Sequence, residues 1–370
     1  MQAPNTFSLP QDLPPEFGAI ADGLIQLTPS ETALGEGVKQ LVKTKSLLDL
    51  LTNERGGSAV VSQVLGPRYS YGTIDAYSYA HGLLPFFRSQ RERSKESADY
   101  KALVSPEITI GESWKWTPES ETKEHNDAVV RASFNALVEE RSSHAASYTH
   151  IPKLGLVLAA EGKNRVALFR KLDLPIPALV SDQDYPDAKR IRLIYLDQVA
   201  FAILDDRYAQ RLVSSELTRI ILEPYGVKVE KIWPESYPSL ERVLDAFDRK
   251  AYSADSRFND IDMQPVQYRQ LAEETIVPAS IMEFEKGLRP SMLTIGYGFA
   301  IALMLSVVTA MFWEVRLIST ISLSLAVTFY AALMLAFAPL FRCQVQQLGE
   351  DAAQRHRLDL IEKFSRNNPN

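Results

Sequence analysis

The stretch LGLVLAAEGKNRVALFRKLDLPIPALV, residues 154–180, decides the fold of the central part of this chain. It opens with an apolar run suited to a buried strand, and the dipeptide Glu161-Gly162 then marks a sharp turn. The segment after Asn164 predicts a short helix, and the residues after Pro175 predict a second strand. The order strand, turn, helix, strand is typical of a mixed α/β domain.

The turn between the first strand and the helix carries groups that suit an anion. Gly162 permits a positive φ, and a helix beginning near Asn164 or Arg165 would direct backbone N–H groups toward the loop. Lys163 and Arg165 add positive charge, while Asn164 adds a donor and an acceptor. Glu161 is placed to pair with a ribose hydroxyl or a metal ion. The alternative is an ordinary polar turn in which Arg165 forms a surface salt bridge.

These residues resemble the core of the ParB/sulfiredoxin-like superfamily. That family shows an acidic residue, Gly, two variable polar positions and Arg after a strand, and its small helix leads into an Ile-Pro strand. The corresponding residues here are Glu161, Gly162, Lys163, Asn164 and Arg165, followed by Ile176 and Pro177. The resemblance implies an α+β domain of this type, in which the five motif residues line a pocket for a nucleotide or nucleic-acid phosphate.

Two departures from the family pattern limit the chemistry that the resemblance implies. Lys163 stands where sulfiredoxins carry their catalytic cysteine, which excludes that reductase activity. Asn164 replaces a His or Arg, which favours binding over hydrolysis, and no helix-turn-helix is recognisable downstream. The implied ligand is a nucleoside triphosphate with a divalent cation. Asp260 and Asp262 form an Asp-x-Asp pair that either holds this cation or is simply solvated.

The segments on either side of the motif predict helical flanks around the α/β domain. An N-terminal arm, residues 1–58, contains an amphipathic helix over residues 31–51, and the α/β domain covers residues 59–200. Within that domain AVVSQVL (59–65) and EITI (107–110) read as short strands, and residues 127–140 as a helix. A helical region and connector, residues 201–285, contains one helix opening at Asp205, another after Pro238, and an irregular stretch over residues 251–278.

Two long uncharged runs near the C-terminus predict a membrane hairpin. Residues 291–313 and 317–341 contain no Asp, Glu, Lys, Arg or His and are separated only by Glu314, Val315 and Arg316. Each run exceeds the roughly 20 residues that cross a bilayer, so we expect a two-helix transmembrane hairpin over residues 291–341. Without an intramembrane charge this hairpin would be an anchor rather than an ion path.

Small residues recur at every fourth position of both runs, which permits close approach of backbones. The two stripes either pack the helices against each other or form the interface of a homo-oligomer. Their members are Gly298, Ala302, Ser306, Ala310, Ser324, Thr328, Ala332 and Ala336.

Basic residues near the ends of the hairpin predict its orientation. Lys286, Arg289 and Arg342 flank the two runs, whereas the connecting loop contains only Arg316. The positive-inside rule then places both termini in the cytosol, with the lipid bilayer as partner and a bacterial inner membrane as the expected location. The tail, residues 342–370, reads either as a surface helix, which we favour, or as a small contact for a partner. No secretory signal opens the chain, and the single Cys343 fits a reducing compartment.

Composition narrows the remaining classes of function. The chain has 40 basic and 46 acidic residues, so any nucleic-acid contact needs a local patch. One candidate is a tyrosine-rich segment that either packs against the core or stacks on a base; its members are Arg68, Tyr69, Tyr71, Tyr77 and Tyr79. The second candidate is a basic run with the members Arg88, Arg91, Arg93 and Lys95. The sequence thus predicts a membrane-anchored, nucleotide-binding protein; the alternative is a non-enzymatic scaffold or oligomeric interaction protein.

Overall fold

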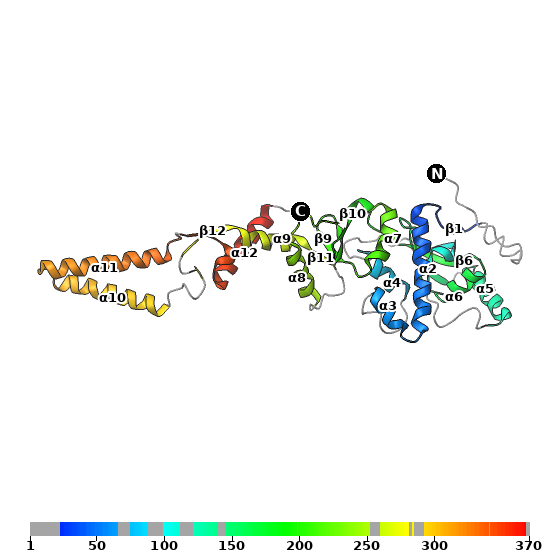
Figure 1. Cartoon of the computed structure of the whole chain (residues 1–370), viewed down its shortest axis with the longest axis horizontal. Coiled ribbons are helices and arrows are strands. Elements are labelled where there is room, and N and C mark those ends of the chain that lie inside the picture. Colours follow the sequence, from blue (N-terminus) through cyan, green and yellow to red (C-terminus); the bar gives the residue numbers. More distant parts are fainter. Residues whose placement is uncertain are drawn as a thin grey trace. The chain divides into compact units, whose positions relative to one another are not determined.

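The computed structural model describes residues 23–65, 75–87, 99–111, 121–138, 145–197, 199–251, 260–280, 283–284, 292–339 and 341–367 (Figure 1). The chain divides into two units. Unit 1 comprises residues 1–234 and 245–262, and unit 2 comprises residues 235–244 and 263–370.

Unit 1 contains a six-stranded mixed sheet with the strand order β1-β2-β6-β4-β5-β3. Its central strands β6, β4 and β5 come from the motif region and the segment before it, so the predicted strands at both ends of residues 154–180 are confirmed. The strands are β1 (Ile25–Leu27), β2 (Tyr100–Val104), β3 (Thr109–Ile110), β4 (Ala146–Ile151), β5 (Leu156–Glu161) and β6 (Ile176–Asp182).

The register of β4 assigns its side chains to the two faces of this sheet. Tyr148 is paired with Val180 of β6 and with Ala159 of β5. Because side chains alternate along a strand, Tyr148 and His150 share one face while Thr149 lies on the other. Thr149 contacts α4, since its hydroxyl lies 2.7 Å from the hydroxyl of Tyr77.

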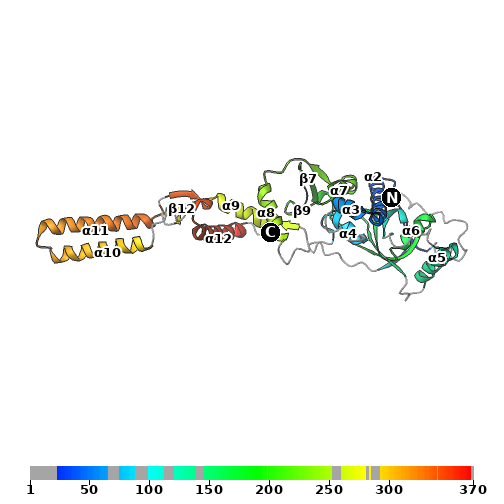
Figure 2. The same ribbon diagram turned by 60° about the horizontal axis from the view of Figure 1, so that its bottom comes forward.

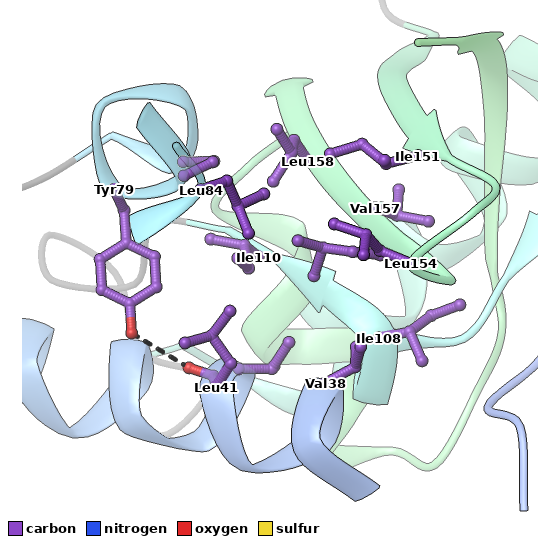
Figure 3. Close-up of a cluster of buried hydrophobic side chains, with 14 of the residues drawn as sticks. Val38, Leu41, Tyr79, Leu84, Ile108, Ile110, Ile151, Leu154, Val157 and Leu158 are labelled. Atoms are coloured by element: carbon purple, nitrogen blue, oxygen red, sulfur yellow. Dashed lines mark hydrogen bonds between the residues drawn. The ribbon is translucent and has the colours of Figure 1, made fainter. Parts of the chain in front are cut away.

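Helices of unit 1 pack against the sheet through apolar side chains. Figure 3 shows residues of α2 and α4 together with residues of β3 and β5, and the Tyr79 hydroxyl donates to the Leu41 carbonyl at 3.3 Å. Asp75 caps α4 by accepting from the backbone N–H groups of Tyr77 and Ser78. The helices are α2 (Ala33–Asn53), α3 (Gly57–Leu65), α4 (Ala76–Leu83), α5 (Lys123–Val138) and α6 (Arg165–Lys171), with the 3₁₀ turn η2 (Pro106–Ile108).

A second sheet of unit 1 has the order β10-β7-β8-β9-β11. Its strands β7, β8 and β9 form an antiparallel meander, in which Asp205 and Asp206, both at φ 54°, make the turn between β8 and β9. The elements are η4 (Ala188–Arg190), β7 (Ile191–Tyr195), β8 (Ala200–Leu204), β9 (Tyr208–Arg211), α7 (Ser215–Tyr225), β10 (Lys228–Glu230) and β11 (Asp260–Asp262). Helix α8 (Leu240–Ala251) begins in unit 2 and ends in unit 1.

Unit 2 contains a two-stranded sheet, a small apolar core and a helical hairpin that is inserted between the two strands. Strands β12 and β13 pair antiparallel, and a small apolar core around Val277, Val345 and Ala353 lies beside them. The chain between these strands forms α10 and α11, which lie side by side in Figures 1 and 2. The elements are α9 (Met263–Glu274), β12 (Ile276–Ala279), α10 (Met292–Met311), α11 (Arg316–Phe337), β13 (Phe341–Gln344), η6 (Val345–Gln347) and α12 (Glu350–Asn367).

The predicted helical hairpin is present, but the prediction that it crosses a membrane is wrong. Across the described residues, none of the helices combines the length and the apolarity that a bilayer crossing requires. The second uncharged run does not remain helical, because α11 ends at Phe337 and Phe341 already belongs to β13. The predicted transmembrane fold and the two-pass localisation with cytosolic termini in a bacterial inner membrane are therefore overturned.

Several predicted elements outside the motif region also differ from the structure. Of the strand predicted over residues 107–110, only Thr109 and Ile110 form a strand, β3, because Pro106–Ile108 form the 3₁₀ turn η2. The Val-rich residues 59–65 form part of helix α3, because Val61 and Leu65, one helical turn apart, are the side chains that reach the core. Asp205 opens a turn rather than a helix, and α7 begins only at Ser215. The predicted irregular connector contains β11, α9 and β12. The helices predicted over residues 31–51, over residues 127–140, after Pro238 and in the tail are confirmed.

Candidate functional site

The loop between β5 and α6 contains the glycine turn that the sequence predicted between a strand and a helix. β5 ends at Glu161, Gly162 adopts φ +74°, and the backbone N–H of Arg165 donates to the Gly162 carbonyl at 3.0 Å. A Cβ atom on Gly162 would lie 3.0 Å from the Cβ atom of Ala146 on β4. Glycine is therefore required both by the backbone conformation and by the close approach of the neighbouring strand.

Arg165 connects this loop to helix α5. Its side chain is half-buried, and its Nη1 atom lies 3.4 Å from the Ser133 hydroxyl, to which it donates. The two residues are 32 positions apart in the sequence, so this contact depends on the packing of α5 against the sheet. Arg165 thus presents a positive charge at the edge of the interior rather than in open solvent.

Tyr148 of β4 contributes a buried hydroxyl that the charge of Arg165 influences. The residue is only 1 % exposed, and among the described residues its hydroxyl has no hydrogen-bond partner. Burial raises the pKa of Tyr148, and the positive charge of Arg165 acts in the opposite direction. A neutral phenol therefore lies within the electrostatic reach of the guanidinium. Leaving such a group unsatisfied costs about 1–3 kcal/mol, which a polar ligand would recover.

The other basic residue of the loop, Lys163, interacts electrostatically with the acidic Asp75. Burial of Asp75 opposes its ionisation, but hydrogen bonds from Ser78 and Tyr77, together with the positive charge of Lys163, lower the pKa of Asp75. The backbone of Lys163 is also confined, because a Cβ atom on Gly111 would lie 2.7 Å from the Lys163 carbonyl oxygen. Lys163 therefore adds less positive potential to the loop than the sequence suggests.

The predicted set of free helix N–H groups is only partly present. The N–H of Arg165 bonds to Gly162 and that of Val166 bonds to the Lys163 carbonyl at 3.4 Å, so both are used within the loop. Asn164 is exposed and makes no side-chain cap, and α6 has only seven residues. Side chains rather than the helix end must therefore supply the donors to a ligand.

The Asp-x-Asp pair is held by cations of the protein. Asp262 accepts from Arg207 at 2.9 Å, and a carboxylate oxygen of Asp260 lies 3.6 Å from the ammonium of Lys250. Both lie on the edge strand β11 of the second sheet, away from the loop after β5. Within the described part of the chain, His, Cys, Asp and Glu side chains form no group of three that would hold a metal ion.

A second polar cluster lies on the sheet face that carries Tyr148. The hydroxyl of Tyr100 donates to Asp182 at 2.8 Å, and Nδ1 of His150 lies 3.1 Å from the same carboxylate oxygen. Burial lowers the pKa of His150, and the neighbouring Asp182 opposes this shift only in part. The cluster therefore favours a neutral imidazole.

Sequence reasoning missed Ser133 and Tyr148. The alternation in ASYTHI, residues 146–151, indicates that Ala146, Tyr148 and His150 share a face, but nothing local shows which partner lies opposite. Of the tyrosine-rich segment, Tyr79 is buried and Tyr77 contacts Thr149, as the packing interpretation predicted. The other members of that segment and the whole basic run, Arg88 to Lys95, lie outside the described residues.

No protein-family model, curated protein sequence or solved structure matches this chain.

Proposed function

We propose that the protein binds the phosphate of a nucleotide or nucleic acid at the loop formed by Glu161, Gly162, Lys163, Asn164 and Arg165. The observation that carries this proposal is the buried hydroxyl of Tyr148, which has no partner among the described residues and lies within reach of the Arg165 charge. A phosphate oxygen would accept from both groups. The resemblance of the loop to ParB/sulfiredoxin-like proteins supports the same ligand class.

The chemistry of the loop favours an anion with several oxygens. A guanidinium presents donors in a planar fork that matches phosphate, and charge-assisted hydrogen bonds are about twice as strong as neutral ones. Gly162 lets the backbone pass close to β4 without a side chain blocking the loop. The exposed Asn164 is available at the rim for the sugar or base. We assign recognition to this site and no catalytic residue, because Asp260 and Asp262 are engaged by Lys250 and Arg207.

Equilibrium binding of nucleoside triphosphates and short oligonucleotides to the full chain tests the proposal. Replacing Arg165 by Gln should weaken binding about 10- to 100-fold, since hydrogen bonds to charged groups contribute about 1.5–3 kcal/mol. Tyr148→Phe should weaken binding several-fold while leaving thermal stability unchanged or higher, because it removes an unsatisfied buried hydroxyl. This combination separates a ligand contact from a structural role.

The matched control is Arg131→Gln, which removes the same charge from an exposed position of α5, two residues before Ser133. It should leave affinity unchanged. The proposal is wrong if no nucleotide or oligonucleotide binds the wild-type chain, or if Arg165→Gln and Arg131→Gln bind equally well.

A non-enzymatic scaffold is the second candidate, favoured by one independent observation. Helices α10 and α11 expose large apolar side chains such as Met311 and Leu317, which are 75 % and 73 % exposed. Surfaces of this kind usually bind a partner. Loss of nucleotide binding in every assay, with an association that depends on these helices, would favour this function.

A further inference from the structure

The hairpin of α10 and α11 has an outer surface on which large apolar side chains are exposed, as measured against the residues that the structure describes. Large apolar side chains project from both helices with 48–75 % of their surface exposed, including Leu303, Met304, Met311, Leu317, Leu323 and Met334. Exposed apolar side chains that gather on a monomer usually mark a site of interaction with another molecule.

The inner surface of the hairpin is built differently. The side chains buried between the helices are small or carry hydroxyls, as in Ala302, Thr309 and Ala326. Thr309 donates to the Ser322 hydroxyl at 2.6 Å, and Ser322 donates to the Leu305 carbonyl at 2.5 Å. These bonds satisfy the polar groups inside the pair and leave its largest apolar side chains pointing outward.

The chemistry of the outer surface restricts the partner. Between Met292 and Met311, and again between Leu317 and Phe337, the sequence contains no Asp, Glu, Lys, Arg or His. A partner that placed a charge against this surface would lose its hydration without gaining a counter-ion. The partner must therefore be apolar and uncharged over about 30 Å, the length of a 20-residue helix.

We propose that this partner is the hairpin of a second copy of the chain. The α10–α11 hairpin itself has the required length and apolarity, and it contains no Asp, Glu, Lys, Arg or His between Met292 and Met311 or between Leu317 and Phe337. Two hairpins packed together would form a four-helix assembly, the common solution by which paired helices bury an apolar face. The inference is independent of the nucleotide site, because it rests on unit 2 alone.

The small-residue stripes have different roles in this assembly. Ala302 of the first stripe is buried within its own hairpin, whereas Ser324 and Thr328 of the second stripe face outward. The second stripe therefore lies on the surface that meets the other copy. Small side chains there allow the neighbouring helix to approach closely, while the larger residues beside them supply the buried area.

The segments that flank the hairpin contact each other directly, so the hairpin can be deleted without separating them. The rings of Phe284 and Phe341 contact edge to face with centroids 5.9 Å apart, and β12 pairs with β13 below them. Replacing residues 286–339 by a short Gly-Ser linker should therefore preserve the core of unit 2. Sedimentation equilibrium in detergent-free buffer should show a dimer for the wild type and a monomer for this deletion.

Disulfide trapping in the full chain locates the contact. Leu303→Cys, Met304→Cys and Val327→Cys each add a thiol on the outer surface, while the native Cys343 is buried. Mild oxidation should shift at least one of these variants to a covalent dimer. The control Ile232→Cys places a thiol at a 79 % exposed apolar position of unit 1 and should remain monomeric, as should the wild type.

Four outcomes would overturn the proposal. They are a wild type that sediments as a monomer at every concentration, a deletion that remains dimeric, trapping equal to that of Ile232→Cys, and aggregation without defined stoichiometry. A monomeric wild type that floats with phosphatidylcholine vesicles only when the hairpin is present would assign the surface to lipid hydrocarbon instead.

Discussion

The ammonium of Lys45 lies 2.6 Å from both carboxylate oxygens of Asp49, and neither residue is more than 1 % exposed. Lys45 also donates to the Gly111 carbonyl at 3.3 Å and lies 5.9 Å from the centre of the Tyr79 ring. Gly111 in turn packs against the Lys163 backbone. This ion pair of helix α2 is therefore connected to the candidate loop through Gly111, which contacts both Lys45 and the Lys163 backbone.

Removing one member of the pair should destabilise unit 1 strongly. Lys45→Met leaves a buried carboxylate without its counter-ion, which costs about 3–5 kcal/mol. Thermal unfolding followed by circular dichroism should show a clearly lower Tm, and the double variant Lys45→Met/Asp49→Leu should recover most of it. As a control, Lys39→Met breaks the exposed pair with Glu36 and should change stability by less than about 1 kcal/mol. Equal effects at Lys45 and Lys39 would contradict this account.

A side chain at Gly162 should cost more than one at Gly155. Both glycines have positive φ, +74° and +66°, but only Gly162 has a neighbour within 4 Å of a built Cβ atom. Gly155→Ala should lose about 1 kcal/mol through backbone strain, and Gly162→Ala should lose more because Ala146 must also move. Chemical denaturation of both variants measures the difference. Equal losses would show that contact with β4 does not constrain the loop.

The crossing of α2 and α7 should not tolerate alanine at Gly37. A Cβ atom there would lie 2.4 Å from the Ile220 carbonyl oxygen. Alanine gains about 1 kcal/mol of helix propensity, but separating two packed helices costs about 1–3 kcal/mol. We expect a net loss of stability for Gly37→Ala and almost none for Lys43→Ala, an exposed position of the same helix. A stabilised Gly37→Ala variant would refute this close crossing.

The free energy of unfolding should fall at acidic pH because the buried His150 resists protonation in the folded protein. Because burial lowers its pKa in the folded protein, the unfolded chain binds the proton first, and the free energy of unfolding rises with pH. The contribution is complete above the unfolded value of about 6.5 and is lost as pH falls through the lower folded pKa. Melting curves between about pH 5 and 8 should be flatter for His150→Gln than for the wild type. The exposed His125→Gln should retain the wild-type profile.

Local patterns correctly predicted the elements in which the spacing of apolar residues matches the face that is buried in the structure. The order of β5, the Gly162 turn, α6 and β6 follows from an apolar run, a glycine and a short helical segment within 27 residues. The same agreement holds for α2, α5, α8, α12 and the pairing of α10 with α11. These elements depend mainly on neighbours three or four positions away, which a sequence displays directly.

Patterns failed where distant contacts decided the outcome. The valines of residues 59–65 suit a strand, yet the core accepts Val61 and Leu65 from one face of a helix. The uncharged runs suggested a bilayer crossing, but the second run is shared between α11 and β13 because Phe341 pairs with Ala279. Pairing across a sheet is not visible in a single segment.

The sequence by itself determined the loop from Glu161 to Arg165 and the positive charge that it carries. Only the tertiary structure decided what surrounds that charge, because Tyr148 comes from β4 and Ser133 from α5. The physical reason is that conformation at a glycine turn is a local property, whereas burial of a hydroxyl beside a guanidinium depends on how strands and helices far apart in the chain pack together.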